Sequence, residues 1–293
     1  MTDSAKHTFA DLPKPFSSTV HVDICGLTDR GHVRENNEDH YLIIRAARAL
    51  ETISSSLPMN SPDRFEETGY GFVVADGVGG HAAGEIASRE AIFGLLSLAL
   101  HTPDWQFKWG FRETNTVKWR MQDRFRRVNA ALVQMATAQA ALSGMCTTMT
   151  AALSHGQNLI IGHIGDSRAY LMRRGKLQRI TRDHTLAETF SGVGDKRLND
   201  RLDPLGNVLI QALGGSESEC TPDIDDYLLN DGDQLLVCTD GLTDMVEDLE
   251  IETVLLKAKS AQAACRSLVD LALTNGGRDN VTVIVARYSF PQP

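Results

Sequence analysis

The sequence contains a series of short apolar runs that are rich in β-branched residues and bounded by turn signals. The pairs His155-Gly156 and Arg174-Gly175 separate neighbouring runs, so antiparallel hairpins are expected there. Because each run has only five to nine residues, it fits a strand better than a helix. The clearest runs are Tyr70–Asp76, Thr147–Ser154, Asn158–Ile164, Arg168–Met172, Gln234–Thr239 and Asn280–Tyr288.

Helical patterns lie in separate blocks between these runs. Apolar residues recur at helical spacing in Glu85–Leu100, Lys118–Leu142 and Ala261–Asn275. Ser260 is placed to cap the last of these helices, and Gly276 follows its end. Strands in runs and helices in separate blocks, without strict βαβ alternation, predict an α+β fold.

The chain is expected to form one domain. Residues 1–18 are polar and carry two prolines, which predicts a flexible leader, and residues 19–293 show no linker that would divide them. Two stretches resemble insertions, at 50–67 and 101–127. The first contains a serine triplet and two prolines and is predicted to be a loop. The second begins with an aromatic stretch, which fits a packing segment better than a docking surface.

Composition narrows the class of protein. The net charge is −9, which argues against a nucleic-acid backbone as the main partner. The five cysteines are scattered without a Cys-x-x-Cys pair, so idle thiols in a reducing compartment are expected rather than a zinc site. No signal-peptide pattern or bilayer-length apolar run is present. The predicted location is therefore the cytoplasm.

Aspartates occur repeatedly where strand patterns begin or end. Asp76 and Asp240 close apolar runs, and Asp279 opens the last one. Antiparallel strands bring such ends to the same rim of a sheet. Carboxylates gathered at one rim repel each other unless cations neutralise them, and oxygen ligands suit Mg²⁺ and Mn²⁺.

Two further acidic clusters carry weaker signals when taken alone. In the segment Arg34–Asp39 an arginine precedes carboxylates, and its planar fork matches the geometry of phosphate oxygens. Asp166 lies between two strand patterns, where a type I turn would account for it. Asp244, four residues after Asp240, suits a helix cap.

Eight segments, taken together in their order, resemble the metal-dependent serine/threonine protein phosphatases of the 2C type. The form Asp-Gly-x-Gly-Gly-His at Asp76–His81 is similar to the bacterial branch. The other seven segments are Arg34–Asp39, Gly144–Ala152, Ile164–Leu171, Leu177–His184, Ala212–Gly215, Thr239–Asp244 and Asp279–Val283.

The resemblance implies a four-layer α/β-β/α sandwich, in which two antiparallel sheets are flanked by helices and a binuclear metal centre lies at one end. Asp76 would bridge both ions, with the Gly77 carbonyl on one of them, and Asp166 would hold a third ion. Arg34, Asp76 and Asp240 would be the catalytic residues, with Arg34 on the substrate phosphate. The implied metal ligands are Glu38, Asp39, Asp76, Gly77, Asp166, Asp240 and Asp279.

The implied reaction is hydrolysis of phosphoserine and phosphothreonine in proteins by direct attack of a hydroxide that bridges two Mn²⁺ or Mg²⁺ ions. The implied partners are phosphorylated proteins, either a bacterial serine/threonine kinase or its targets. Neither nucleic acid nor membrane is expected as a partner, and the chain is expected to be a monomer.

One departure from the family pattern leaves the general acid open. The eukaryotic branch has a histidine two residues after the bridging aspartate, where this chain has Val78. His81 could be the general acid or could hold its own turn by a hydrogen bond. His184 could also serve as the acid but more readily organises a turn. Metal-bound water is a further source of the proton for the leaving group. The segment 185–211 corresponds to the family's variable flap, where cationic residues either contact a phosphopeptide or are solvated.

Two other classes of function compete with this interpretation. A catalytically silent module could retain the fold and bind a partner, but the complete set Asp76, Asp240 and Asp279, with Arg34, argues against it. A small-molecule phosphomonoesterase or a nuclease could use the same ions. The acidic charge and the absence of a basic stripe disfavour a nuclease.

Overall fold

The computed structural model describes residues 19–54, 56, 64–78, 82–101, 111–190, 208–215 and 219–291. The predicted leader, at 1–18, lies outside these ranges. The same is true of 191–207, the middle of the predicted flap, and of 102–110, most of the aromatic stretch.

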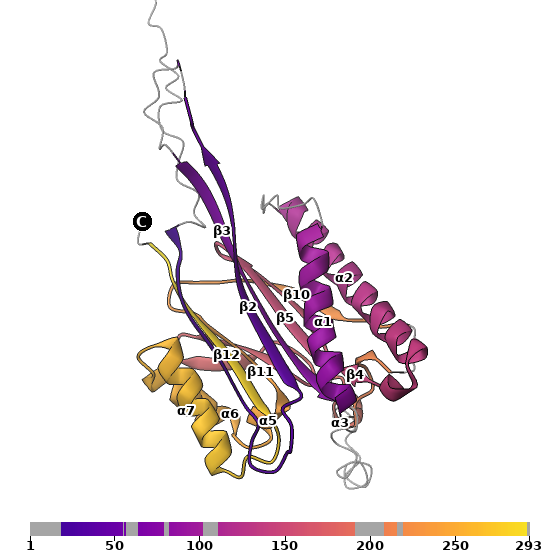
Figure 1. Cartoon of the computed structure of the whole chain (residues 1–293). Coiled ribbons are helices and arrows are strands. Elements are labelled where there is room, and N and C mark those ends of the chain that lie inside the picture. Colours follow the sequence, from indigo (N-terminus) through magenta and orange to yellow (C-terminus); the bar gives the residue numbers. More distant parts are fainter. Residues whose placement is uncertain are drawn as a thin grey trace, which may run out of the picture.

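Two antiparallel sheets face each other in the described residues (Figure 1). In the first, the strand order is β1 (His21–Asp29), β12 (Val281–Ser289), β11 (Gln234–Cys238), β7 (Arg168–Arg173) and β8 (Lys176–Arg179). In the second, the order is β10 (Asp223–Leu228), β6 (Asn158–Ile164), β5 (Met149–His155), β3 (Arg64–Val78), β4 (Cys146–Thr147) and β9 (Leu213–Gly214), and β2 (Asp39–Glu51) also pairs with β3.

Helices cover the outer face of each sheet, which confirms the predicted four-layer sandwich (Figure 1). The second sheet is covered by α1 (Ala82–His101) and α2 (Phe111–Ala138). The first is covered by α6 (Asp248–Lys257) and α7 (Ala261–Thr274). The short elements are η2 (Ala140–Leu142), α3 (Leu186–Phe190) and α5 (Asp240–Thr243). No helix in the described ranges has the length and apolarity that a membrane crossing requires.

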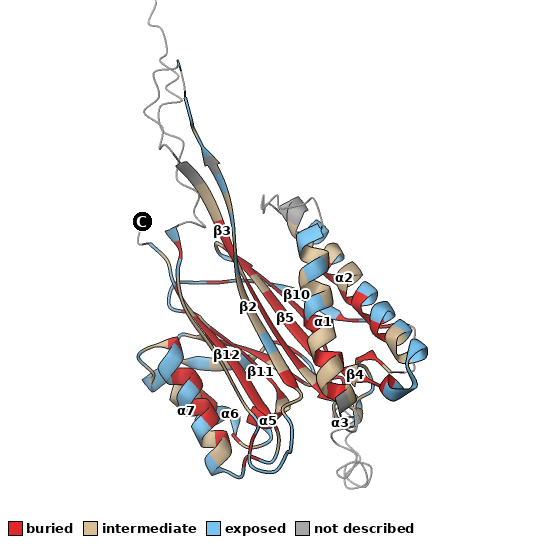
Figure 2. Ribbon diagram, in the orientation of Figure 1, coloured by how far each residue is buried: buried red, intermediate tan, exposed pale blue. Residues whose placement is uncertain are grey.

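Three apolar cores hold the four layers together (Figure 2). Alternate residues of β3 show how this works, because Phe72 points into the core between the sheets and Val73 points into the core under α1 and α2. Leu236 and Leu268 belong to the third core, between the first sheet and the helices α6 and α7. Both faces of the central strands are therefore buried, which makes the strand ends rigid supports.

Local sequence chemistry explains the predicted boundaries that are confirmed. Arg174 and Gly175 have φ values of 50° and 78°, so the β7–β8 hairpin has the two positive φ angles of a type I′ turn. Ser260 caps α7 by accepting the Ala263 backbone N–H at 3.1 Å. Gly276, just past that helix, has φ 134°.

The prediction of a loop over 50–67 is wrong at both ends. The strand β2 continues to Glu51 and β3 resumes at Arg64, and these two residues are register partners. The polar residues there pair across the strands, since Arg45 contacts Glu66 at 2.9 Å. An exposed hairpin arm can use such cross-strand ion pairs, and polarity alone therefore did not indicate a loop.

The long helix also begins earlier than predicted. It starts at Phe111 rather than Lys118 and ends at Ala138, and the predicted tail at 140–142 is a separate 3₁₀ turn. Its amphipathic pattern places Met121 and Phe125 against the second sheet.

Gly162 on β6 generates a stability prediction. A Cβ atom there would lie 2.6 Å from the sulfur of Met121 and 3.0 Å from Phe125, so α2 packs directly on the glycine. We expect Gly162→Val to lower the free energy of unfolding by about 1–3 kcal/mol. The change Asn158→Val, at the half-buried start of the same strand, is the control and should stay within about 0.5 kcal/mol. Equal urea midpoints for the two variants would contradict this packing.

Candidate metal centre

Four aspartates from separate strands meet at one end of the sandwich. Asp39 opens β2 and is the register partner of Asp76 near the end of β3. Asp240 follows β11 within two residues, and Asp279 precedes β12, the antiparallel neighbour of β11. We call Asp39, Asp76, Asp240 and Asp279 the rim carboxylates.

The electrostatics of the rim show how closely these groups gather. Burial raises the pKa of Asp39 to about 7, and the charges of Asp240 and Asp279 add to the effect. Burial also raises the pKa of Asp240 to about 6, and the charges of Asp244 and Asp279 add to the effect. For Asp76 the pKa lies well above its usual value, first because of burial and then because of Asp39 and Asp240.

Two oxygens of this group have no hydrogen-bond partner among the described residues. They are Asp39 Oδ1 and Asp240 Oδ1, and both are buried. The other oxygen of Asp39 accepts the hydroxyl of Thr239 at 2.8 Å. Orphaned, buried carboxylate oxygens cost free energy unless a cation or proton satisfies them. These carboxylate oxygens are the type of ligand that a hard divalent ion prefers. In the described ranges, however, no three acidic, histidine or cysteine side chains already have the arrangement of a metal site.

Glu38 and Gly77 meet at the start of α1. Gly84, in the first turn of this helix, has no room for a side chain, because a Cβ would lie 2.8 Å from the Gly77 carbonyl and would overlap the Glu38 carboxylate. The Glu38 carbonyl accepts the Gly77 N–H at 3.2 Å and the Ser88 hydroxyl at 2.6 Å. This close packing directs Glu38 and the Gly77 carbonyl toward the same place.

Arg34 lies among the carboxylates. Its guanidinium donates to Asp279 at 2.5 Å, and about half of the side chain is exposed. The hydrogen bond to Asp279, with the nearby charges of Asp76 and Glu38, raises the pKa of Arg34. A guanidinium that is both exposed and held at the rim is suitably placed to meet an incoming phosphate.

Asn280 fixes the loop that carries Arg34 and Glu38. Its side-chain oxygen accepts the Glu38 N–H at 2.7 Å, and its amide donates to the carbonyls of Arg30 and Asn36 at 2.8 and 2.9 Å. This buried side chain therefore keeps the residue 30–38 loop in register with Asp279.

Asp166 lies on the turn between β6 and β7, near the rim. Burial raises its pKa to about 8, and the charges of Asp240 and Asp183 contribute. Gly165, the first residue of the turn predicted over Gly165–Arg168, has φ 105°. A Cβ at Gly165 would lie 2.6 Å from Thr148, so only glycine fits there.

Of the two histidines considered as general acids, only His184 lies in the described residues. His81 lies outside the described residues. His184 is buried in a hydrogen-bonded network with Gly165 and Asp223. Its neighbour Asp183 binds Arg168 through both carboxylate oxygens, so the pair Asp183-His184 organises its turn as predicted. Asp244 is the C-cap of α5, as predicted.

Sequence reasoning missed the supporting side chains. Thr239 binds Asp39, Thr148 accepts the Asp76 N–H at 3.1 Å, and Asn280 holds the loop. For Thr239 and Asn280 the available signal was a small polar residue directly beside an acidic position, whereas Thr148 has no acidic neighbour in the sequence.

Comparison with known proteins gives the family. The sequence profile described as protein phosphatase 2C matches residues 63–271. The serine/threonine phosphatase Stp of Listeria welshimeri is 31% identical over 268 residues, which cover 90% of this chain and 95% of the relative. This chain belongs to the protein phosphatase 2C family.

A second relative connects the family to a solved structure. The serine/threonine protein phosphatase PstP of Mycobacterium tuberculosis is 36% identical over 262 residues, or 88% of this chain and 43% of the relative. A crystal structure of the PstP catalytic domain with two manganese ions has a TM-score of 0.71 at 32% identity and covers 92% of this chain and all of that chain. These findings confirm the predicted family, the sandwich fold and the enzyme class, protein serine/threonine phosphatase.

The raised pKa values generate a prediction for the metal-free protein. The unfolded carboxyls ionise near 3.8, whereas Asp240 and Asp39 in the folded protein ionise at about 6 and 7. The folded state therefore binds more protons over this range, and the free energy of unfolding should fall as the pH rises from about 4 to about 8. Urea unfolding in EDTA measures it, and Asp240→Asn should flatten the slope. Stability that rises over this range would contradict the account.

Proposed function

We propose that this chain removes phosphate from phosphoserine and phosphothreonine in proteins, using Mn²⁺ or Mg²⁺ held by the rim carboxylates. The observation that carries the proposal is a pair of buried oxygens beside Asp76, on Asp39 and Asp240, that accept no hydrogen bond from the part of the chain that the structure describes. Such groups are too costly to leave uncompensated, and hard cations compensate them best.

Each residue has a role that follows from its position. Asp76 is the register partner of Asp39, and the charge of Asp240 also acts on it. Asp76 would therefore hold ions together with both of them, and Gly77 would add its carbonyl. Glu38 and Asp279 would supply further carboxylate oxygens, and Asp166 would hold a further ion. The ions, when bound, supply an activated water and neutralise charge on the phosphoryl oxygens.

Arg34 binds and orients the substrate in this proposal. Its planar fork suits two phosphoryl oxygens, and its exposure leaves it reachable from solvent. In the transition state it would stabilise the charge on the oxygens that do not react. His184 is committed to Gly165 and Asp223, so we do not assign it as the proton donor to the leaving group.

The family's biology suggests the setting. We infer phosphorylated proteins as substrates, with a serine/threonine kinase or its targets among them, acted on by a monomer in the cytoplasm. The phosphatase names of the relatives support the substrate class.

The first test is hydrolysis itself. We expect Mn²⁺-dependent turnover of p-nitrophenyl phosphate and of a phosphothreonine peptide, abolished by EDTA and insensitive to okadaic acid. The release of phosphate measures both reactions. An absence of turnover with every divalent ion would favour a silent binding module, and turnover of free nucleotides but not of the peptide would favour a small-molecule phosphatase.

The second test concerns the ligand set. We expect Asp240→Asn to lower kcat by roughly 100-fold or more. The change removes one of the negative charges that would bind the metal ions, so the ions should be held less tightly. Asp270→Asn, on the exposed face of α7, is the matched control and should keep full activity. Circular dichroism checks that both variants fold, and a wild-type rate for Asp240→Asn would refute the assignment.

A further inference from the structure

The turn that carries Asp166 depends on one histidine for its shape. Gly165 has no side chain to fix its conformation, and its φ of 105° is open only to glycine-like backbone. Both of its backbone polar groups bind His184. The Gly165 N–H donates to Nδ1 of the imidazole at 3.3 Å, and the Gly165 carbonyl accepts the His184 backbone N–H at 2.7 Å.

The opposite side of the imidazole determines which nitrogen carries the proton. Nε2 lies 3.2 Å from the Asp223 carboxylate on β10, the edge strand of the second sheet. Because Nδ1 accepts from Gly165, the neutral ring carries its proton on Nε2 and donates it to Asp223. Asp223 therefore keeps the ring in the tautomer that Gly165 requires.

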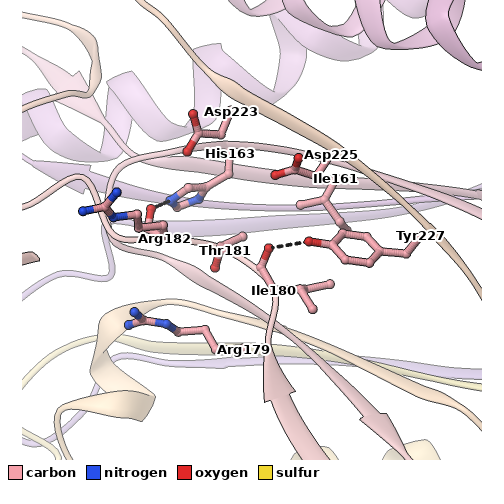
Figure 3. Close-up of a pocket in the computed structure, with 9 residues that line it drawn as sticks. All are labelled: Ile161, His163, Arg179, Ile180, Thr181, Arg182, Asp223, Asp225 and Tyr227. Carbon is pink, nitrogen blue, oxygen red and sulfur yellow. Dashed lines mark hydrogen bonds between the residues drawn. The ribbon is translucent and has the colours of Figure 1, made fainter.

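The surroundings hold the ring in place. The ring of His163 on β6 packs against it at a tilt of 45°, with ring centroids 5.0 Å apart. His163 is itself held by the Arg182 carbonyl at 3.0 Å (Figure 3). A cavity of about 210 Å³ lies beside His163, with Asp223 and His163 in its wall and Tyr227 at its other end (Figure 3). The imidazole thus sits between a rigid strand and the Asp166 turn.

The backbone of His184 reaches a third element. Its carbonyl accepts the Ile210 N–H at 2.9 Å, and the next residue, Thr185, forms a β-bridge with Leu209. Leu186 continues the contact by donating to the Val208 carbonyl at 2.9 Å. The two ends of the segment predicted as the flap therefore join at the residue that binds the Asp166 turn.

We infer that His184 is a positioning residue, which holds the Asp166 carboxylate for a divalent ion and ties it to the base of the 185–211 segment. This inference rests on the role proposed for Asp166. Groups that orient a ligand in this way alter metal affinity although they do not touch the metal.

Two substitutions separate the roles of the two ring nitrogens. In His184→Asn the amide oxygen replaces Nδ1 and can still accept the Gly165 N–H. In His184→Gln the amide lies farther out, near Nε2, and the Gly165 bond is lost. We expect Gly165 amide exchange, measured by NMR on the metal-free protein, to be about tenfold faster in His184→Gln and close to wild type in His184→Asn.

The same variants should differ in their response to metal. In His184→Gln we expect the Mn²⁺ concentration that half-saturates the weakest binding event in calorimetry to rise about tenfold, while the tighter events are retained. In the Asp166→Ala background the further change His184→Gln should have no additional effect on Mn²⁺ binding. Wild-type exchange and Mn²⁺ binding in His184→Gln would overturn the inference, as would an Asn variant that behaves like the Gln variant.

A second pair of variants tests the network if the histidine variants do not fold. Asp223→Leu removes the acceptor for Nε2–H and should also speed Gly165 exchange. Asp225→Leu, on the same face of β10, leaves that contact intact and should not. Equal exchange in the two variants would overturn the inference. If Asp166→Ala alone leaves Mn²⁺ binding unchanged, the role proposed for Asp166 fails, whereas the exchange comparison still decides the role of His184.

Discussion

Repulsion among buried carboxylates is the constraint on which the rest of this structure depends. Asp39 and Asp76 lie on the paired strands β2 and β3, and Asp240 begins α5. The charges of Asp39 and Asp240 both raise the pKa of Asp76, and the charge of Asp240 also raises that of Asp39. Folding alone would not favour this arrangement, because the cost of burying like charges opposes it. The four-layer sandwich supplies the opposing free energy through its three apolar cores, and bound cations would supply the rest.

Side chains and glycines around the rim carboxylates hold these carboxylates and Arg34 in place. Thr239 orients Asp39, Asn280 connects the Arg34 loop to Asp279, and the close packing of Gly77 on Gly84 brings α1 against Glu38. The contacts of Thr239 with Asp39 and of Asn280 with Glu38 join residues that are distant in the sequence. The site is therefore a property of the tertiary fold, even though its acidic residues lie in short local motifs.

The sequence predicted the parts that follow from local chemistry. Strand periodicity located β6, the positive-φ pair Arg174-Gly175 marked a hairpin, and aspartates at strand ends indicated the rim. It failed where tertiary pairing overrides composition. The polar ends of β2 and β3 form strands because ion pairs such as Arg45–Glu66 hold them.

The most direct measurement is anomalous diffraction at the manganese edge from crystals grown with Mn²⁺. The account predicts two strong peaks at the rim, with Asp76 between them and Asp39, Asp240 and Asp279 around them, and a weaker peak at Asp166. Rim carboxylates that point to different faces, with no manganese among them, would contradict the central claim.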